Sequence, residues 1–257
     1  MIVCRSAAEL ERMRDAGRLV GEVLAELASH VAPGVTTADL DAMAEARIAR
    51  AGATPAFKGY HGYPATICAS INEEVIHGIP SGRRVMNEGD ILSIDVGVSL
   101  NGYFGDSAIT VAVGKVSEQA ADLLRATEES LYKAIERVRP GGRISDIGHA
   151  VQKHVEANGF SVVREFVGHG IGQRMHEEPQ VPNYGEPGRG PRLAEGMVLA
   201  IEPMVNAGKA AVKVLADGWT AVTKDGSLSA HFEHTVAVTA DGPWILTARD
   251  VPVPAHR

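Results

Sequence analysis

The sequence ILSIDVGVSLNGYFGDSAITVAV, residues 91–113, alternates with a period of two on both sides of Asn101-Gly102. Such alternation is typical of strands with one buried face, and Asn-Gly between two alternating runs is a strong signal for a two-residue hairpin turn. The segment therefore predicts two long antiparallel strands joined at Asn101-Gly102.

The register of this hairpin places two acidic residues on one face. With the turn centred on Asn101-Gly102, counting outward puts Asp95 opposite Ala108 and makes Asp106 its diagonal neighbour, with Cα atoms roughly 7–8 Å apart. A buried carboxylate is costly unless it is paired or binds a metal. We therefore expect both carboxylates to reach one ion.

Two further acids stand in strand-like runs, Glu202 in VLAIEPMV (198–205) and Glu233 in HFEHTVAV (231–238). The alternative for these acids is a set of buried salt bridges to Lys or Arg. However, the runs that carry Asp95, Glu202 and Glu233 hold no basic residue at neighbouring inward positions, which favours a cation site.

A weak internal repeat runs through the chain. Apolar residues at helical spacing occupy residues 10–31 and again about 119–139, and the two runs stop at Pro33-Gly34 and, 107 residues later, at Pro140-Gly141. The same offset pairs further residues that end helices or turn the chain: Asp39 with Asp146, Gly52 with Gly159, Gly78 with Gly185, Pro80 with Pro187, and Glu88-Gly89 with Glu195-Gly196. Coincidence in a glycine-rich chain is the alternative to duplication.

The offset also aligns ILSIDVGV (91–98) with VLAIEPMV (198–205), so that Asp95 corresponds to Glu202. Each half follows the order helix, helix, strands. We therefore expect an α+β fold of two pseudo-twofold related halves, approximately residues 5–110 and 111–248. Carboxylates from a central strand of each half would meet in the cleft between them, which is a natural cation site.

One histidine stands out because of its glycine-rich setting. His169 lies in GHGIG (168–172), where glycines allow the backbone to approach a ligand closely, and we expect a strand at VVREFV (162–167) to deliver it to the cleft. A lone histidine is more often structural. Here one nitrogen donor joins four carboxylates without a thiolate, which suits first-row divalent ions such as Mn, Fe, Co or Zn. Four carboxylates suit two such ions roughly 3.5–4 Å apart, an arrangement typical of hydrolases.

Composition and charge exclude several classes of protein. The 257 residues are 45% hydrophobic and 22% charged, as in soluble globular proteins, and the net charge of −7 argues against a dominant nucleic-acid-binding face. Arg5 and Glu9 precede any apolar run, unlike in a secretory signal, and no apolar stretch is long enough to span a membrane. Only Cys4 and Cys68 are present, which suits a reducing compartment. We expect one compact cytoplasmic domain, residues 1–257.

Six segments carry a resemblance to a known family: GYHGYPATICASINEEVIHGIP (59–80), IDVGVSLNGYFGD (94–106), VVREFVGHGIG (162–172), HEEPQV (176–181), IEPMVNAGK (201–209) and DGWTAVTKDGSLSAHFEHT (217–235). From about residue 5 to residue 248 the chain resembles the type I methionine aminopeptidases. The resemblance implies the pita-bread fold, a curved antiparallel sheet flanked by helices with an internal pseudo-twofold. It also implies a catalytic domain that removes the initiator methionine from nascent proteins when the second residue is small.

The resemblance implies a set of five metal ligands at Asp95, Asp106, His169, Glu202 and Glu233. Asp106 and Glu233 would bridge two divalent ions. Asp95 would complete one site, and His169 with Glu202 the other. Glu202 would also act as the general base for the attacking water.

Two more histidines, His77 in HGIP and His176 in HEEP, match family positions that contact the substrate backbone or stabilise a developing oxyanion. From the residues alone, surface or packing histidines are the alternative. We interpret His61, inside GYHGYP, as structural.

The resemblance also implies an apolar pocket for the methionine side chain, lined by Phe57, Tyr60, Tyr63, Cys68, Met175 and Trp219. Aromatic and sulfur contacts suit an unbranched thioether. A purely structural core role is a strong alternative for Phe57 and a weak one for Trp219, which lies in a polar DGWT turn.

The chain departs from the family pattern in two places. At Gln173-Arg174-Met175 many relatives carry a basic residue first and Phe last, which puts the tightness of the pocket in doubt although Met175 keeps it apolar. His231 is the second departure and lies close to Glu233.

The resemblance implies N-terminal peptides of nascent proteins as substrates, acted on by a monomer without a membrane partner, and leaves docking on the ribosome open. One rival is a proline-specific peptidase of the same fold, which normally carries a large extra N-terminal domain for which this chain has no room. Another is a non-catalytic binding protein that has lost its metals. The intact ligand set counts against the second.

Overall fold

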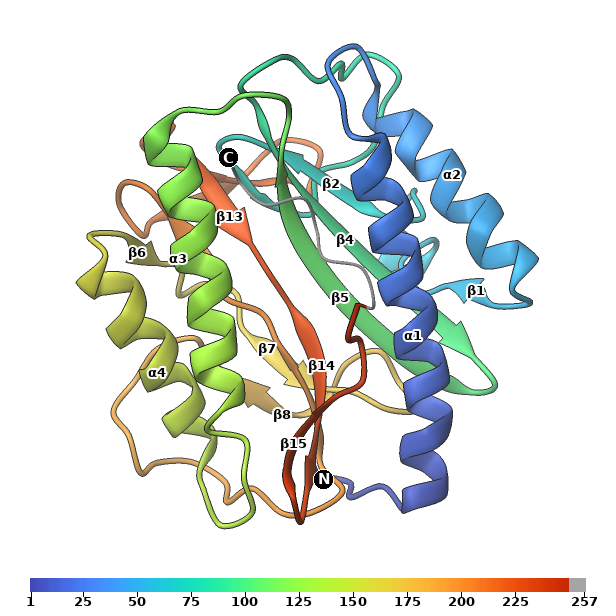
Figure 1. Cartoon of the computed structure of the whole chain (residues 1–257), viewed down its shortest axis with the longest axis vertical. Coiled ribbons are helices and arrows are strands. Elements are labelled where there is room, and N and C mark those ends of the chain that lie inside the picture. The colour runs from blue at the N-terminus through green and yellow to red at the C-terminus, as the bar shows by residue number, and fades with distance from the viewer. Residues whose placement is uncertain (250–257) are drawn as a thin grey trace.

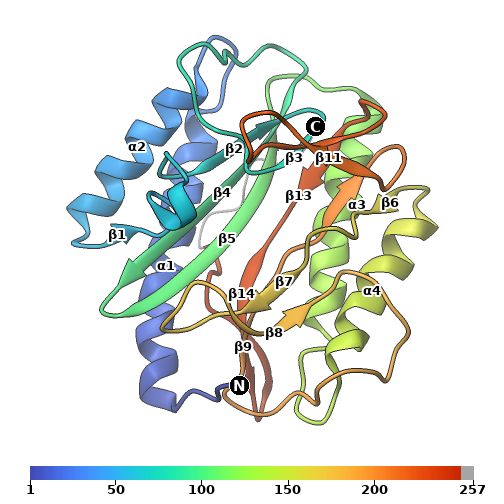
Figure 2. The ribbon, with the colours of Figure 1, turned by 180° about the vertical axis from the view of Figure 1, so that it is seen from behind.

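Four α-helices flank the strands in the part of the chain that the structure describes. The structure, a computed structural model, describes residues 1–249. Figure 1 shows the helices in two pairs, with strands between and behind them, and Figure 2 shows the strands in front of the helices when the molecule is seen from behind. The helices therefore cover one side of the strands. They are α1 (Ala7–His30), α2 (Thr37–Arg50), α3 (Glu118–Ile135) and α4 (Ile144–Ala157).

The predicted hairpin is confirmed, with its register. Strands β4 (Ile91–Leu100) and β5 (Tyr103–Ala112) pair antiparallel, with Asp95 opposite Ala108. Asn101 and Gly102 both have positive φ, 53° and 81°, as a turn that matches the right-handed twist of the strands requires. The hairpin therefore has the register obtained by counting.

The remaining strands are short and all their pairings are antiparallel. One sheet has the order β1-β4-β2 with β5 on β4, a second has the order β15-β14-β9-β7-β8, and two three-stranded sheets have the orders β13-β10-β6 and β11-β12-β3. The strands outside the hairpin are β1 (Thr54–Pro55), β2 (Cys68–Ile71), β3 (Glu74–Ile76), β6 (Ser161–Val162), β7 (Gly168–Gly170), β8 (Glu177–Val181), β9 (Val198–Ile201), β10 (Met204–Asn206), β11 (Val212–Val214), β12 (Ala221–Thr223), β13 (Ser229–His231), β14 (His234–Thr239) and β15 (Gly242–Ile245), and a 3-10 turn spans Tyr60–Gly62.

Backbone contacts recur at the offset of 107 residues. The Gly34 amide donates to the Met86 carbonyl, and the Gly141 amide donates to the Leu193 carbonyl. An isolated bridge joins residues 36 and 85 in one half, and another joins residues 143 and 192 in the other. In each half, the segment just before the second helix is therefore bonded to an equivalent later segment of the same half.

The helix N-termini show the same correspondence. Asp39 accepts from the Thr36 amide at 2.9 Å, and Asp146 accepts from the Arg143 amide at 2.8 Å. Each acid therefore satisfies a backbone donor that the first turn of the helix leaves without an intrahelical partner.

Helix α1 lies flush against the hairpin strand that carries Asp106. A Cβ on Gly105 would come within 2.9 Å of the Gly17 amide nitrogen, so only glycine allows this approach. The largest apolar cluster contains residues of α1, α3, the hairpin and β9, and so is shared by both halves. Packing across the halves fixes the hairpin relative to β9.

Two sequence-based expectations about strands were wrong. VVREFV (162–167) was expected to be a strand, but only Val162 belongs to one, and residues 163–167 lead irregularly to β7. Glu202 and Glu233 were placed inside strands. Glu202 instead follows β9, and Glu233 lies between β13 and β14. Both acids lie where a strand is interrupted. A backbone that leaves the hydrogen-bond ladder of a sheet can turn its side chain into the cleft.

Candidate metal centre and substrate pocket

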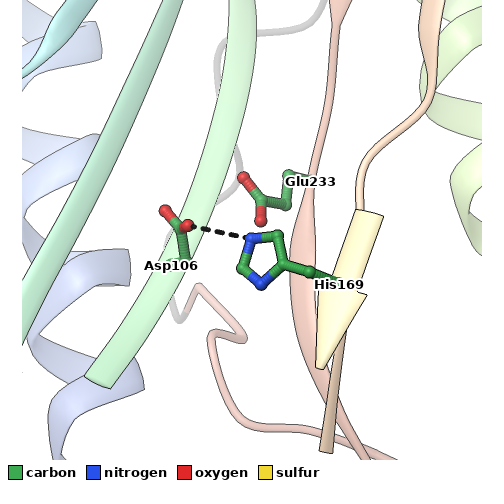
Figure 3. Close-up of side chains that lie close together, drawn as sticks. All are labelled: Asp106, His169 and Glu233. Carbon is green, nitrogen blue, oxygen red and sulfur yellow. Dashed lines mark ion pairs between the residues drawn. The ribbon is translucent and has the colours of Figure 1, made fainter. Parts of the chain in front are cut away.

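Three side chains that are far apart in the sequence point toward one another (Figure 3). Asp106 of β5, His169 of β7 and Glu233 each offer a donor atom, and these atoms lie within 4.8 Å of one another. His169 Nε2 is 3.8 Å from Asp106 Oδ2 and 3.6 Å from Glu202 Oε1. A carboxylate-rich donor set around one imidazole is a set that divalent transition metals bind.

Several carboxylate oxygens in this cluster are buried without a hydrogen-bond partner. They are Asp95 Oδ1, Asp106 Oδ1 and Glu233 Oε1. Among residues 1–249, no Lys or Arg forms an ion pair with these acids or with Glu202. Such oxygens carry a large desolvation penalty unless a cation compensates it, so the residues present fit a metal site.

Burial and mutual repulsion disfavour the charged forms of these acids. Burial raises the pKa of Asp95 to about 7. The pKa values of Asp106, Glu202 and Glu233 are raised well above their usual range, first by burial and then by the neighbouring carboxylates. Four such groups remain ionised together only when positive charge joins them.

His169 is present as a neutral imidazole. Burial, followed by the nearby His176, lowers the pKa of His169 to about 4. Its Nδ1 lies 2.9 Å from the Gly170 carbonyl oxygen, so Nδ1 carries the proton and Nε2 presents its lone pair to the carboxylates. The contact with Asp106 drawn in Figure 3 is therefore a polar approach between a neutral ring and a carboxyl group. This tautomer is the metal-binding form.

Thr235 of β14 braces the Asp106 backbone from the other half of the molecule. Its hydroxyl donates to the Asp106 carbonyl at 2.7 Å and accepts from the Asp106 amide at 3.2 Å. The hydroxyl of Ser107 donates to the Glu233 carbonyl. Both halves thus hold the backbone of the donor residues directly.

A cavity of about 250 Å³ opens on the carboxylate cluster. It brings together every residue that the sequence nominated for the site: Phe57, Tyr60, Tyr63, Cys68, His77, Asp95, Asp106, His169, Met175, His176, Glu202, Trp219 and Glu233. His61 also lines it, although the sequence suggested a structural role. Its positive φ of 47° within GYHGYP turns the chain at the cavity mouth, which no periodic pattern signals.

Two neutral histidines flank the cluster. Burial lowers the pKa of His77 to about 4, and burial lowers the pKa of His176, to which the nearby His61 adds. The His176 ring centroid lies 4.2 Å from that of His169, and His176 Nδ1 lies 2.8 Å from the Tyr60 hydroxyl oxygen. Tyr60 thus holds the His176 ring beside the cluster.

One wall of the cavity is apolar and contains two sulfur atoms. Cys68 and Met175 are buried there with aromatic rings around them. The rings of Tyr63 and Trp219 meet edge to face with centroids 5.1 Å apart. Asp217 accepts from the backbone amide of Trp219 at 2.8 Å, which fixes the turn that carries the indole. This apolar wall suits an unbranched apolar side chain.

Fold and donor set together define a metal-dependent hydrolase with the pita-bread architecture. The sequence pattern of metallopeptidase family M24 matches residues 11–240. The chain is 58% identical over 247 residues to the methionine aminopeptidase of Clostridium acetobutylicum, covering 96% of this chain and 99% of that protein. It is 57% identical over 247 residues to methionine aminopeptidase 1 of Bacillus subtilis, with the same coverage.

A solved structure agrees with these sequence relatives. The methionine aminopeptidase of Thermotoga maritima superposes with a TM-score of 0.95 at 47% identity, covering 97% of this chain and all of that one. The chain therefore belongs to metallopeptidase family M24 and, within it, to the methionine aminopeptidases. The expected family and fold class are confirmed.

Proposed function

We propose that this enzyme removes the N-terminal methionine from newly made proteins whose second residue is small. The observation that carries the proposal is a single cavity in which a pocket lined by aromatic rings and sulfur opens on a cluster of buried carboxylates. The names of the relatives support the same activity.

The proposed cofactor is a pair of divalent ions, Co, Mn, Fe or Zn, held by Asp95, Asp106, His169, Glu202 and Glu233. The unpartnered oxygens and the neutral imidazole support this assignment. When bound, such ions supply an acidified water and polarise the substrate carbonyl. Asp106 and Glu233, whose donor atoms lie within 4.8 Å of each other and of His169, would hold the ions jointly.

The proposed roles of the remaining polar residues follow from their places around the cluster. Glu202 accepts the proton released by the attacking water, since its carboxylate lines the cavity beside His169. His77 and His176 hold N–H groups toward the substrate backbone and the oxyanion that develops from its carbonyl. Both imidazoles donate as neutral rings, because burial lowers their pKa values.

The pocket orients the methionine side chain and excludes water. Phe57, Tyr60 and Tyr63 form aromatic walls, Trp219 closes one side, and Cys68 and Met175 supply polarisable sulfur. A bound thioether places the scissile carbonyl next to the carboxylate cluster, since the pocket and the cluster share one cavity.

We further propose a single catalytic domain made of the halves 5–110 and 111–248, acting in the cytoplasm as a monomer. The recurring backbone contacts at the offset of 107 support the two halves. Cys4 and Cys68 are free, which suits a reducing compartment. No helix within residues 1–249 has the length and apolarity of a membrane span. The domain prediction extends to residue 257, and its last eight residues lie outside the described part of the chain.

The proposal is tested with three peptides on the metal-loaded enzyme. Met-Ala-Ser is expected to be cleaved after methionine, whereas Met-Arg-Ser is expected to be cleaved at least about 100-fold more slowly in kcat/KM, the discrimination that unfavourable packing produces. Ala-Pro tests the proline-specific rival. Equal cleavage of the two methionine peptides would refute the requirement for a small second residue, and preferential cleavage of Ala-Pro would replace methionine removal with the rival activity.

A further inference from the structure

A buried ion pair joins the N-terminal segment to the turn that carries His176. Arg5 lies just before α1, and its guanidinium Nη2 donates to Glu177 Oε2 at 2.5 Å. The side chains are only 5% and 7% exposed. The partners are 172 residues apart in the sequence, and burying a guanidinium is costly unless it is paired. The other acid that faces it is Glu9, at 3.9 Å.

The guanidinium lies directly on the turn. A Cβ on Gly172 would come within 2.1 Å of the Arg5 guanidinium, so this planar group packs against the glycine backbone. The second carboxylate oxygen of Glu177 accepts from the Arg174 amide at 3.1 Å. The backbone amide of Arg5 donates to the Gly196 carbonyl, and this hydrogen bond holds the N-terminal segment against residue 196. The turn 172–177 is therefore held at both ends by one side chain.

Two residues of this turn, Met175 and His176, line the cavity. Met175 forms part of its apolar wall, and His176 lies beside the carboxylate cluster. Glu177 follows His176 directly, so a shift of the backbone at Glu177 is passed to the residue that carries the imidazole. The ring has a second support in the Tyr60 hydroxyl. Arg5 touches neither the cavity nor the cluster.

We propose that Arg5 and Glu177 are positioning residues that hold His176 at the angle its proposed role requires. This inference rests on the proposed function. The pair acts through the turn 172–177 and contributes no group to the chemistry. A small displacement of a group that acts in the transition state lowers kcat while leaving substrate affinity nearly intact.

The test compares Arg5→Met with Arg5→Lys. Arg5→Met is expected to lower kcat for Met-Ala-Ser about tenfold with KM changed less than about threefold. Arg5→Lys, which keeps the charge, is expected to recover most of kcat. Arg47→Met serves as the matched control, because Arg47 pairs with Glu22 between α1 and α2, away from the cavity. It is expected to leave kcat unchanged.

A double-mutant comparison separates positioning from general destabilisation. If Arg5 acts through His176, then Arg5→Met/His176→Ala is no slower than His176→Ala alone. A double variant whose loss of kcat equals the product of the two single losses would overturn the proposal. So would a loss of kcat in Arg47→Met as large as that in Arg5→Met.

Amide exchange of the metal-free protein provides a readout that does not depend on activity. In Arg5→Met the amides of residues 172–177 are expected to exchange at least about tenfold faster, since the Arg174 amide loses a fixed acceptor. Unchanged exchange there would overturn the proposal even if kcat falls. If the wild-type enzyme fails to cleave Met-Ala-Ser, the proposed function fails, and this exchange comparison still decides whether Arg5 holds the turn.

Discussion

Trp219 is the residue whose contribution to the pocket is easiest to isolate. Its turn is fixed by Asp217, and its ring meets the rings of Tyr63 and His77 edge to face in the cavity wall. The indole therefore serves the pocket more than the core.

Trp219→Ala is expected to raise KM for Met-Ala-Ser roughly tenfold, because about 1–1.5 kcal/mol of aromatic contact is lost, with a smaller effect on kcat. Steady-state kinetics on the metal-loaded enzyme measure the effect. Trp244→Phe, at the chain's other tryptophan on β15, is the control and should leave KM unchanged. An unchanged KM in Trp219→Ala would remove this residue from the pocket.

The residue scale also shows what the sequence can and cannot predict. Asp95 and Asp106 were located by counting from a two-residue turn, because a strand alternates strictly. His61 lines the cavity unpredicted, since its orientation depends on positive φ values in an irregular turn. The partnership of Arg5 with Glu177 leaves no local signal, because neither residue breaks a pattern.

At the scale of elements, Thr235 links β14 to β5 through both backbone groups of Asp106. Thr235→Val keeps the shape of the side chain but leaves the buried Asp106 amide and carbonyl without this partner. The expected loss is about 1–3 kcal/mol of unfolding free energy, measured by urea denaturation of the metal-free protein. Thr239→Val, at the outer end of β14, should lose less than half as much. Equal losses would contradict the bracing role.

Helix α2 provides a pair of acids with opposite pH dependence. Hydrogen bonds from Thr36 lower the pKa of Asp39. Its contribution to stability is therefore present above the unfolded pKa of about 3.9 and is lost as the pH falls through the lower folded value. Burial raises the pKa of Asp41, despite hydrogen bonds from the Thr66 and Ile67 amides. The folded state then binds more protons, and Asp41 lowers stability as the pH rises through that window.

Two substitutions test this sign difference. Asp39→Asn is expected to lower the urea midpoint at pH 7 and to have little effect at pH 3. Asp41→Asn keeps an oxygen that accepts from both amides but removes the buried charge, so its midpoint should rise relative to wild type as the pH increases from 3 to 7. Parallel pH profiles for the two variants would show that the burial of Asp41 does not control its ionisation.

The element scale also explains why the fold was only partly predictable. Helix and hairpin positions follow from periodicity and from Pro-Gly or Asn-Gly signals, and they were confirmed. The segment VVREFV was wrongly assigned to a strand, because β-branched residues favour a strand even where the chain must bend toward His169. Glu202 and Glu233 lie at strand interruptions that depend on long-range pairing, which no local pattern encodes.

At the scale of the whole molecule, the two halves matter because neither contains the complete donor set. Asp95 and Asp106 come from the first half, whereas His169, Glu202 and Glu233 come from the second. The shared apolar cluster and the bracing of Asp106 by Thr235 hold the halves together around the carboxylates. The site is therefore a property of the assembled fold.

The most direct test of the metal centre measures bound metal and hydrolysis together. Wild type, Asp106→Ala and the control Asp122→Ala, an exposed acid on α3, are stripped of metal and then given Co or Mn. Wild type and the control are expected to bind two ions per chain and to cleave Met-Ala-Ser only when loaded. Asp106→Ala should bind less metal and lose more than about 100-fold in kcat/KM, beyond the usual effect of residues that merely support a ligand. A wild-type protein that binds no metal, or an Asp106→Ala variant that keeps both ions and full activity, would contradict this account.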